Sequence, residues 1–114
     1  MIFLALGSNL GNRLENIHKT YEYLTYAGDI EKKSPVYESP ALKLENDDQP
    51  QNNYLNSVVQ FNTNLTVYSL LHEIKSIEAS FGGHSNEKWK PRFIDIDILL
   101  FHQVIINENS LIIP

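Results

Sequence analysis

A nine-residue stretch, Phe93-Ile-Asp-Ile-Asp-Ile-Leu-Leu-Phe101, constrains the fold of this 114-residue chain more than any other. Its Ile, Leu and Phe content predicts a β-strand, in which successive side chains point to opposite faces. Asp95 and Asp97 therefore project from the same face, about 6.5–7 Å apart at a rise of about 3.3 Å per residue. Phe93, Leu99 and Phe101 are expected on that face as well. Two carboxylates among apolar side chains repel each other and lose solvation, and a hard divalent cation would relieve both penalties.

This pair of aspartates predicts a metal site, because Mg²⁺ binds one or two carboxylates together with substrate phosphates. The strand is then interpreted as a site for a metal–nucleotide complex. The alternative is a solvent-exposed face on which the two acids only keep an antiparallel sheet soluble. The apolar residues expected beside the aspartates favour the metal site.

Composition narrows the class of protein. The length and the 42% of apolar residues predict one domain, 1–114, with one hydrophobic core. A net charge of −5 with scattered Lys and Arg argues against a nucleic-acid partner, and no apolar run is long enough to cross a membrane. The absence of cysteine excludes disulfides and Cys-ligated zinc, and fits a cytoplasmic location.

The rest of the chain alternates between strand and helix patterns. Strands are expected over 2–6, 30–38 and 54–63, helices over about 13–26 and 67–81, and short apolar strands at 104–106 and 111–113. Asn12 and Thr66 are the expected N-caps of the two helices. The order β-α-β-β-α-β predicts an α+β fold: a ferredoxin-like antiparallel sheet with helices on one face.

Other candidate residues lie near these elements. Tyr54 and Asn56 fall on the face of their strand away from the core, where a ring and an amide can hold a flat heterocycle, although ordinary strand residues look the same. Arg92 is a candidate phosphate clamp, with a surface salt bridge as the alternative. Glu78 lies beside an apolar helix stripe, so a surface carboxylate is expected. The long segment 39–53 is either a functional loop or a floppy excursion.

Four blocks together resemble the 6-hydroxymethyl-7,8-dihydropterin pyrophosphokinases of folate biosynthesis. They occur in the family's order and cover nearly the whole chain. The blocks are Leu4-Ala-Leu-Gly-Ser-Asn-Leu-Gly11, Ser34-Pro-Val-Tyr-Glu-Ser-Pro-Ala-Leu42, Tyr54-Leu-Asn-Ser-Val-Val59 and Trp89-Lys-Pro-Arg-Phe-Ile-Asp-Ile-Asp-Ile-Leu-Leu-Phe101.

The resemblance implies transfer of pyrophosphate from ATP to the hydroxymethyl oxygen of the pterin, with release of AMP. It implies two Mg²⁺ ions on Asp95 and Asp97, and catalytic roles for these two residues and Arg92. The implied pterin contacts are Ser39, Pro40, Leu42, Tyr54, Asn56 and Trp89. The implied nucleotide contacts are Lys75, Glu78, Arg92 and Ile98.

The chain also departs from the family pattern. Many members carry arginines in the loop after the second helix, whereas this chain has Gly-His-Ser-Asn-Glu-Lys over 83–88. Members also continue beyond the position of Pro114, so the chain is expected to be C-terminally incomplete relative to them, or part of a fusion with another folate enzyme. Three hypotheses follow: a pyrophosphokinase, a catalytically dead module that still binds pterin or nucleotide, and an interaction domain without a small-molecule role.

Overall fold

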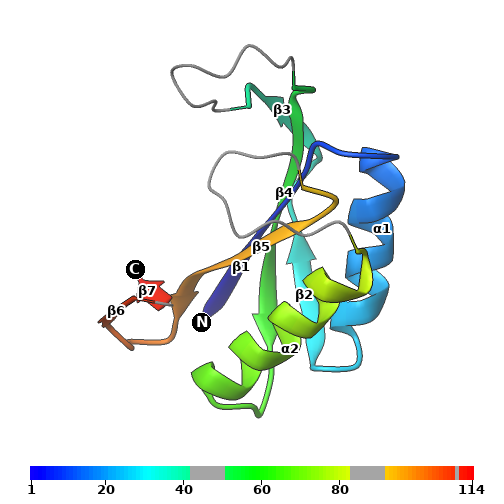
Figure 1. The fold of residues 1–114 in the computed structure, drawn as a ribbon. Helices are drawn as coiled ribbons and strands as arrows, with labels where there is room; N and C mark the ends of the chain where they lie inside the picture. The colour runs from blue at the N-terminus through cyan, green and yellow to red at the C-terminus, as the bar shows by residue number, and fades with distance from the viewer. Residues whose placement is uncertain (42–50, 83–91, 110) are drawn as a thin grey trace.

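The first strand, β1 (Ile2–Ser8), lies inside an antiparallel sheet and pairs with a strand on each side. The computed structural model describes residues 1–41, 51–82, 92–109 and 111–114. The main sheet has the order β2-β4-β1-β5, with β3 as an additional partner of β4 (Figure 1). The remaining bounds are β2 (Asp29–Lys33), β3 (Tyr37–Ser39), β4 (Tyr54–Asn62) and β5 (Asp95–Phe101). This order and the antiparallel pairing confirm the predicted ferredoxin-like arrangement.

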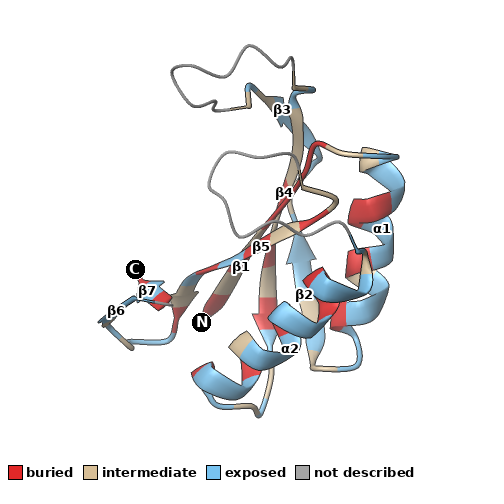
Figure 2. Ribbon diagram, in the orientation of Figure 1, coloured by how far each residue is buried: buried red, intermediate tan, exposed pale blue. Residues whose placement is uncertain are grey.

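Two helices cover the same face of this sheet, α1 (Arg13–Leu24) and α2 (Val67–Ser80). Each begins at its predicted cap: Asn12 Oδ1 accepts from the N–H of Glu15, and Thr66 Oγ1 accepts from the N–H of Ser69, both at 3.1 Å. These bonds satisfy backbone donors that have no partner within a helix. Figure 2 shows the buried residues of both helices on the side that faces the sheet.

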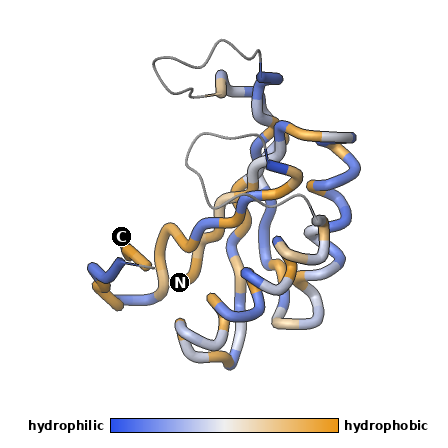
Figure 3. Tube along the Cα trace, viewed as in Figure 1, coloured by the Kyte–Doolittle hydropathy of each residue, from blue (hydrophilic) through white to orange (hydrophobic). Residues whose placement is uncertain are grey.

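The core lies between the helices and the inner face of the sheet. Ile2, Leu4 and Leu6 of β1 meet Ile17 and Leu24 of α1 and Leu70, Ile74 and Ile77 of α2. Figure 3 shows hydrophobic stretches along β1 and at the C-terminal end of β5. The buried stripe of α1 includes two polar residues, Asn16 and Thr20, whereas Leu14 is exposed.

The predicted strand 30–38 is divided into β2 and β3. Proline has no N–H to donate to a ladder, so regular pairing stops near Pro35. Ser34 fills the gap, because its N–H donates to Val58 O at 2.8 Å and its Oγ accepts from Val58 N at 2.9 Å. Pairing with β4 resumes where Tyr37 lies opposite Asn56.

A β-bulge in β5 changes which of its side chains share a face. Leu4 pairs with Ile98 and Phe3 pairs with Leu100, so Leu99 is an extra residue on β5. The bulge reverses the alternation, and Phe101 becomes a buried core residue. The expectation that Phe101 shares the aspartate face is therefore wrong. Phe93 precedes the strand, and its ring lies against Gly11.

A small second sheet follows β5. It consists of β6 (Ile106–Glu108) and β7 (Leu111–Ile113), so the first strand of this pair begins two residues later than predicted. The Tyr68 hydroxyl of α2 donates to Glu108 at 2.9 Å. No helix in the described part of the chain is both long and apolar enough to span a bilayer.

Candidate active site

The register of three strands brings the aspartates and the predicted pterin residues onto neighbouring rows. Gly7 of β1 pairs with Asp95 on one side and with Asn56 on the other. Ala5 likewise lies between Asp97 and Val58. Neighbouring strands are about 4.8 Å apart, so each row spans about 10 Å from β5 to β4. The β1 residues between β5 and β4 on these two rows are Gly7 and Ala5, whose side chains are only a hydrogen atom and a methyl group.

The surroundings of Asp97 make this carboxylate harder to ionise than an ordinary aspartate. The pKa of Asp97 is raised to about 6, because partial desolvation first, and then the charges of Asp95 and Glu78, disfavour its ionised form, while Lys75 partly opposes them. Asp97 remains exposed on its strand, so a ligand can reach this carboxylate. A cation bound between the aspartates would remove the repulsion that raises this pKa, so the donor set fits Mg²⁺.

Protein ligands alone would not surround such a cation. In the described ranges, no group of three or more His, Asp or Glu side chains is placed to hold a metal ion. Mg²⁺ commonly completes its octahedron with water and substrate phosphates. The pair of aspartates therefore suits a cation that arrives with a phosphorylated substrate.

Glu78 is buried, which corrects the expectation of a surface carboxylate. Only 2% of it is exposed, and its Oε2 accepts a hydrogen bond of 2.9 Å from the N–H of Ile96. Ile96 lies between the two aspartates on β5, the last strand of the sheet order. The carboxylate thus satisfies a backbone donor midway between the candidate metal ligands. Its Oε1 lies 3.3 Å from Lys75 Nζ.

A pocket of about 320 Å³ opens between α2, β5 and β7. Lys75, Asp97 and Ile98 are among its lining residues, so it brings together two predicted nucleotide contacts and one aspartate. Its other lining residues are Leu71, Ile96, Leu99, Leu111, Ile112 and Pro114. Lys75 and Asp97 are its charged lining residues, and apolar side chains with a few polar groups are typical of small-molecule sites.

Tyr54 begins β4, two residues before Asn56, and pairs with Ser39 of β3. Burial raises the pKa of its phenol, Asp95 and Asp97 raise it further, and Arg92 lowers it. Electrostatic influence on one ring from all three residues means that these predicted site residues converge in space. A Cβ on Gly7 would stand only 3.2 Å from Tyr54 Cδ1, so glycine allows the ring to lie close to the strand.

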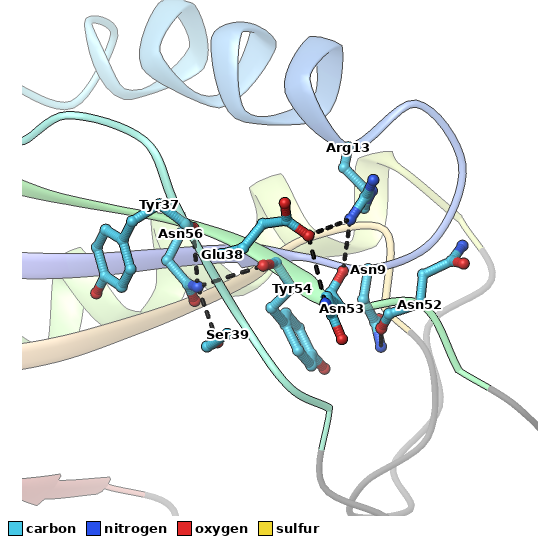
Figure 4. A network of polar contacts seen from close by, with 9 residues as sticks. All are labelled: Asn9, Arg13, Tyr37, Glu38, Ser39, Asn52, Asn53, Tyr54 and Asn56. Carbon is cyan, nitrogen blue, oxygen red and sulfur yellow. Dashed lines mark hydrogen bonds and ion pairs between the residues drawn. The ribbon is translucent and has the colours of Figure 1, made fainter.

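Asn56 is oriented by the edge strand β3. Its Nδ2 donates to Ser39 Oγ at 2.9 Å and to Tyr37 O at 3.2 Å (Figure 4). These bonds identify the nitrogen and the oxygen of the Asn56 amide. They leave Oδ1 on the side of Gly7, where it would lie about 3.5 Å from a Cβ built on Gly7. Ser39 and Asn56 are therefore brought together as predicted, and Pro40 follows them as an exposed residue.

A second polar group joins the start of α1 to the entry of β4. Arg13 donates to Asn53 O at 2.9 Å and lies 3.8 Å from the Glu38 carboxylate. Asn53 Nδ2 also donates to Glu38 at 3.4 Å (Figure 4). These contacts fix the chain just before Tyr54. Leu42 and Trp89, the other two predicted pterin contacts, lie outside the described residues.

Arg92 is held through its backbone. Its N–H donates to Asn9 Oδ1 at 2.8 Å, and its carbonyl accepts from Asn9 N at 3.1 Å. The turn after β1 and the segment before β5 are thereby joined at one residue. A guanidinium at this position lies within electrostatic reach of Tyr54.

The family model of 7,8-dihydro-6-hydroxymethylpterin-pyrophosphokinase (HPPK) matches residues 3–114. The chain belongs to the HPPK family. The match covers every element that forms the site, from β1 to β7. The predicted family is thus confirmed, and the four sequence blocks lie within it.

Named relatives agree with HPPK membership. A 2-amino-4-hydroxy-6-hydroxymethyldihydropteridine pyrophosphokinase of Aquifex aeolicus is 43% identical over 113 residues, which cover 99% of this chain and 68% of that protein. The corresponding protein of Bacillus subtilis is 35% identical, with 98% of this chain and 66% of the relative covered. A folate synthesis bifunctional protein of Chlamydia trachomatis is 47% identical, with 88% and 23% covered. The chain therefore spans about two thirds of two HPPK relatives and less than a quarter of the bifunctional one.

Several site residues of this HPPK chain were not predicted as such. Asn9 and Asn16 are buried and bind backbone groups, and Arg13 fixes the entry to β4. A signal for Asn16 was present, because it stands beside Ile17 on the sheet-facing side of α1. An amide in the core stripe of a helix needs buried partners, and this predicts a structural polar contact.

Proposed function

We propose that this chain carries out the pyrophosphoryl transfer implied by its family, within one domain over residues 1–114 that works in the cytoplasm. The hydroxymethyl oxygen of 6-hydroxymethyl-7,8-dihydropterin would form a bond to the β-phosphorus of ATP. The bond from that phosphorus to the oxygen bridging to the α-phosphate would break, and AMP would leave with the electron pair. The strand register that places Asp95 and Asn56 on either side of Gly7, with Asp97 opposite Ala5, carries the proposal.

The pterin is proposed to bind at the β3–β4 end of the site, against Tyr54, Asn56, Ser39 and Pro40. The Tyr54 ring offers a face for stacking, and the Asn56 Oδ1 offers an acceptor for the ring N–H groups of a pterin. Ser39 fixes the amide in this orientation through the 2.9 Å bond to Nδ2. Leu42 and Trp89 complete the predicted contacts by sequence position.

The nucleotide is proposed to bind in the pocket between α2, β5 and β7, at the other end of the aspartates. Ile98 supplies an apolar wall, and Lys75 supplies a positive charge near Asp97. Glu78 holds β5 against α2 beneath this pocket. Arg92 is proposed to bind the phosphates, because a guanidinium fork can hold two oxygens at once.

Asp95 and Asp97 are proposed to hold Mg²⁺, two ions in the family pattern. When bound, the metal would neutralise phosphate charge and align the phosphoryl chain for in-line displacement. The residues themselves supply oxygen ligands on one strand face, between the pterin end and the nucleotide pocket. Asp97 is also proposed to accept the hydroxyl proton, because its carboxylate is exposed and lies on the same strand face as Asp95.

The direct test incubates the protein with ATP, Mg²⁺ and 6-hydroxymethyl-7,8-dihydropterin and measures the AMP formed by chromatography. The proposal predicts equal amounts of AMP and pterin diphosphate, both dependent on Mg²⁺, with strong loss in Asp95→Asn. Asp29→Asn is the matched control, because Asp29 is an exposed acid on β2. Absence of AMP from the wild-type chain would refute turnover.

A second candidate is a module that binds pterin or nucleotide without turnover. The arginine-free sequence 83–88 favours it, because arginine is the residue best suited to bidentate phosphate contact. Calorimetric titration separates the two. Heat from a non-hydrolysable ATP analogue with Mg²⁺, or from the pterin, in a chain that releases no AMP would select the binding module.

A further inference from the structure

Asn9 is a buried amide at the junction of the two halves of the site. Only 1% of it is exposed, and it follows directly after β1. Three separate segments meet at its backbone and side chain: the turn 8–12, the residues 51–52 before β4, and the segment that carries Arg92 (Figure 4 shows its contact with Asn52). A buried polar side chain with partners on distant segments fixes their relative positions.

One side of Asn9 fixes Arg92. The pair is closed in both directions, because Arg92 N donates to Asn9 Oδ1 at 2.8 Å and Asn9 N donates to Arg92 O at 3.1 Å. Two hydrogen bonds on one residue restrict both its translation and its rotation. The direction from which the Arg92 side chain leaves the backbone is thereby set by Asn9.

The other side of Asn9 fixes the chain that enters β4. Its Nδ2 donates to Gln51 Oε1 at 3.1 Å and lies 3.4 Å from Asn52 O. These residues immediately precede Asn53, which Arg13 holds, and Tyr54. The side-chain amide of Asn9 thus contacts residues 51–52, which lead to the proposed pterin site, through its nitrogen. It contacts the backbone of Arg92 through its oxygen.

Asn16 of α1 binds the residues that flank Asn9. Its Nδ2 lies within hydrogen-bonding distance of Ser8 Oγ, Leu10 O and Phe93 O, at 3.2, 2.9 and 3.2 Å. The residues on each side of Asn9, and the residue after Arg92, are therefore anchored to α1. The position of Asn9 is set by the fold and does not depend on a ligand.

We propose that Asn9 is a positioning residue that couples the pterin end of the site to Arg92. The inference rests on the proposed pyrophosphoryl transfer and deepens it, because it names the residue that keeps the two substrates in register. Asn9 would contact neither substrate. It would act through the backbone of Arg92 and through residues 51–52.

A double-mutant cycle on kcat/KM tests this coupling. Asn9→Ala and Arg92→Ala are each expected to lower kcat/KM by about tenfold or more, and the loss in the double variant to fall short of the product by about fivefold. A non-additive result means that Asn9 acts through Arg92. Losses that multiply would overturn the coupling, even if each single variant is impaired.

Asn9→Asp tests the acceptor and the donor of the Asn9 amide separately. It keeps an oxygen acceptor for Arg92 N and replaces the donor toward Gln51 and Asn52 with a second acceptor. We expect Asn9→Asp to raise KM for the pterin about fivefold or more. Arg92→Ala, added to Asn9→Asp, is expected to lower kcat/KM nearly as much as it does in the wild-type chain. Gln51→Leu, which leaves the Arg92 contact intact, is expected to raise KM for the pterin in the same direction.

Matched measurements distinguish positioning from general damage. Asn62→Asp makes the same chemical change at an exposed residue at the far end of β4 and is expected to leave both KM values unchanged. If Asn9→Ala fails to fold, Asn9→Asp and Gln51→Leu carry the test. Wild-type turnover with unchanged pterin KM in both would refute the coupling alone, whereas absence of wild-type turnover would refute the proposed function and this inference with it.

Discussion

The pterin end and the nucleotide end of the candidate site are stabilised in different ways. Around Asn56, at least four hydrogen bonds and one ion pair join β3, the start of β4 and the start of α1, and most of their side chains are exposed or half-buried. Around Ile98, apolar side chains pack beside one buried carboxylate, that of Glu78. A distributed network loses little when one member is removed, whereas an end that depends on one buried group is sensitive to that group.

The aspartates between the two ends give the largest expected effect. Asp97→Asn keeps the size of the side chain and removes the charge that would hold the metal. A metal contributes several kcal/mol to transition-state stabilisation, so kcat is expected to fall by about 10³-fold. AMP formation at saturating substrates measures this, with Asp29→Asn as the control. Activity within a factor of about three of wild type would argue against a metal role for Asp97.

The nucleotide end is tested most sharply at Glu78. Glu78→Leu leaves the N–H of Ile96 without its acceptor, which costs about 1–3 kcal/mol of unfolding free energy. Glu78→Gln retains an oxygen acceptor and is expected to lose clearly less. Urea denaturation of the two variants compares them directly. Equal losses would mean that the charge of Glu78, and not its hydrogen bond, stabilises this end.

The pterin end is expected to respond more weakly. Ser39→Ala removes one acceptor of Asn56 Nδ2, while the carbonyl of Tyr37 remains in place. A single such hydrogen bond contributes about 1 kcal/mol, so KM for the pterin is expected to rise about fivefold with kcat nearly unchanged. Steady-state kinetics with varied pterin measure the effect, and Ser80→Ala at the end of α2 is the control. A larger loss in kcat than in KM would contradict a purely orienting role.

The smallest effect concerns stability and pH in the metal-free protein. The folded-state pKa of Asp97 is raised from 3.8 to about 6, so the folded protein binds more protons than the unfolded chain between these values. Unfolding free energy must therefore fall as pH rises through this window. Because Asp97 is exposed, we expect Asp97→Asn to add only about 1 kcal/mol at pH 7 and nothing below the unfolded pKa. Denaturation at pH 3.5 and pH 7 without Mg²⁺ measures this, and an equal difference at both values would contradict the assignment.

The fold was largely predictable because its signals are local. Helix caps at Asn12 and Thr66, the stripe of α2 and the faces of β4 all follow from residues within one element. Pro35 indicated an interruption of the strand, but the hydrogen bonds by which Ser34 maintains the pairing there depend on Val58 of another strand. The bulge at Leu99 was not predictable, because it exists only in the register between β5 and β1.

The site was predictable where a residue type carries chemistry by itself. Asp95, Asp97, Tyr54 and Asn56 are spaced two apart, and strand periodicity alone places each pair on one face. Asn9 and Glu78 are different, because their partners lie on distant segments of the chain. An asparagine or a glutamate in isolation favours the surface, so only tertiary structure reveals such a residue as a buried support.

The bulge at Leu99 divides β5 into two parts. Before it, the aspartates alternate with the core residues Ile96 and Ile98; Leu99 itself lines the pocket, and Phe101 beyond it belongs to the core. The bulge therefore adds one side chain to the pocket without turning Phe101 out of the core. A one-residue deletion at Leu99 would remove that side chain from the pocket and leave a simple alternation from Ile98 to Phe101.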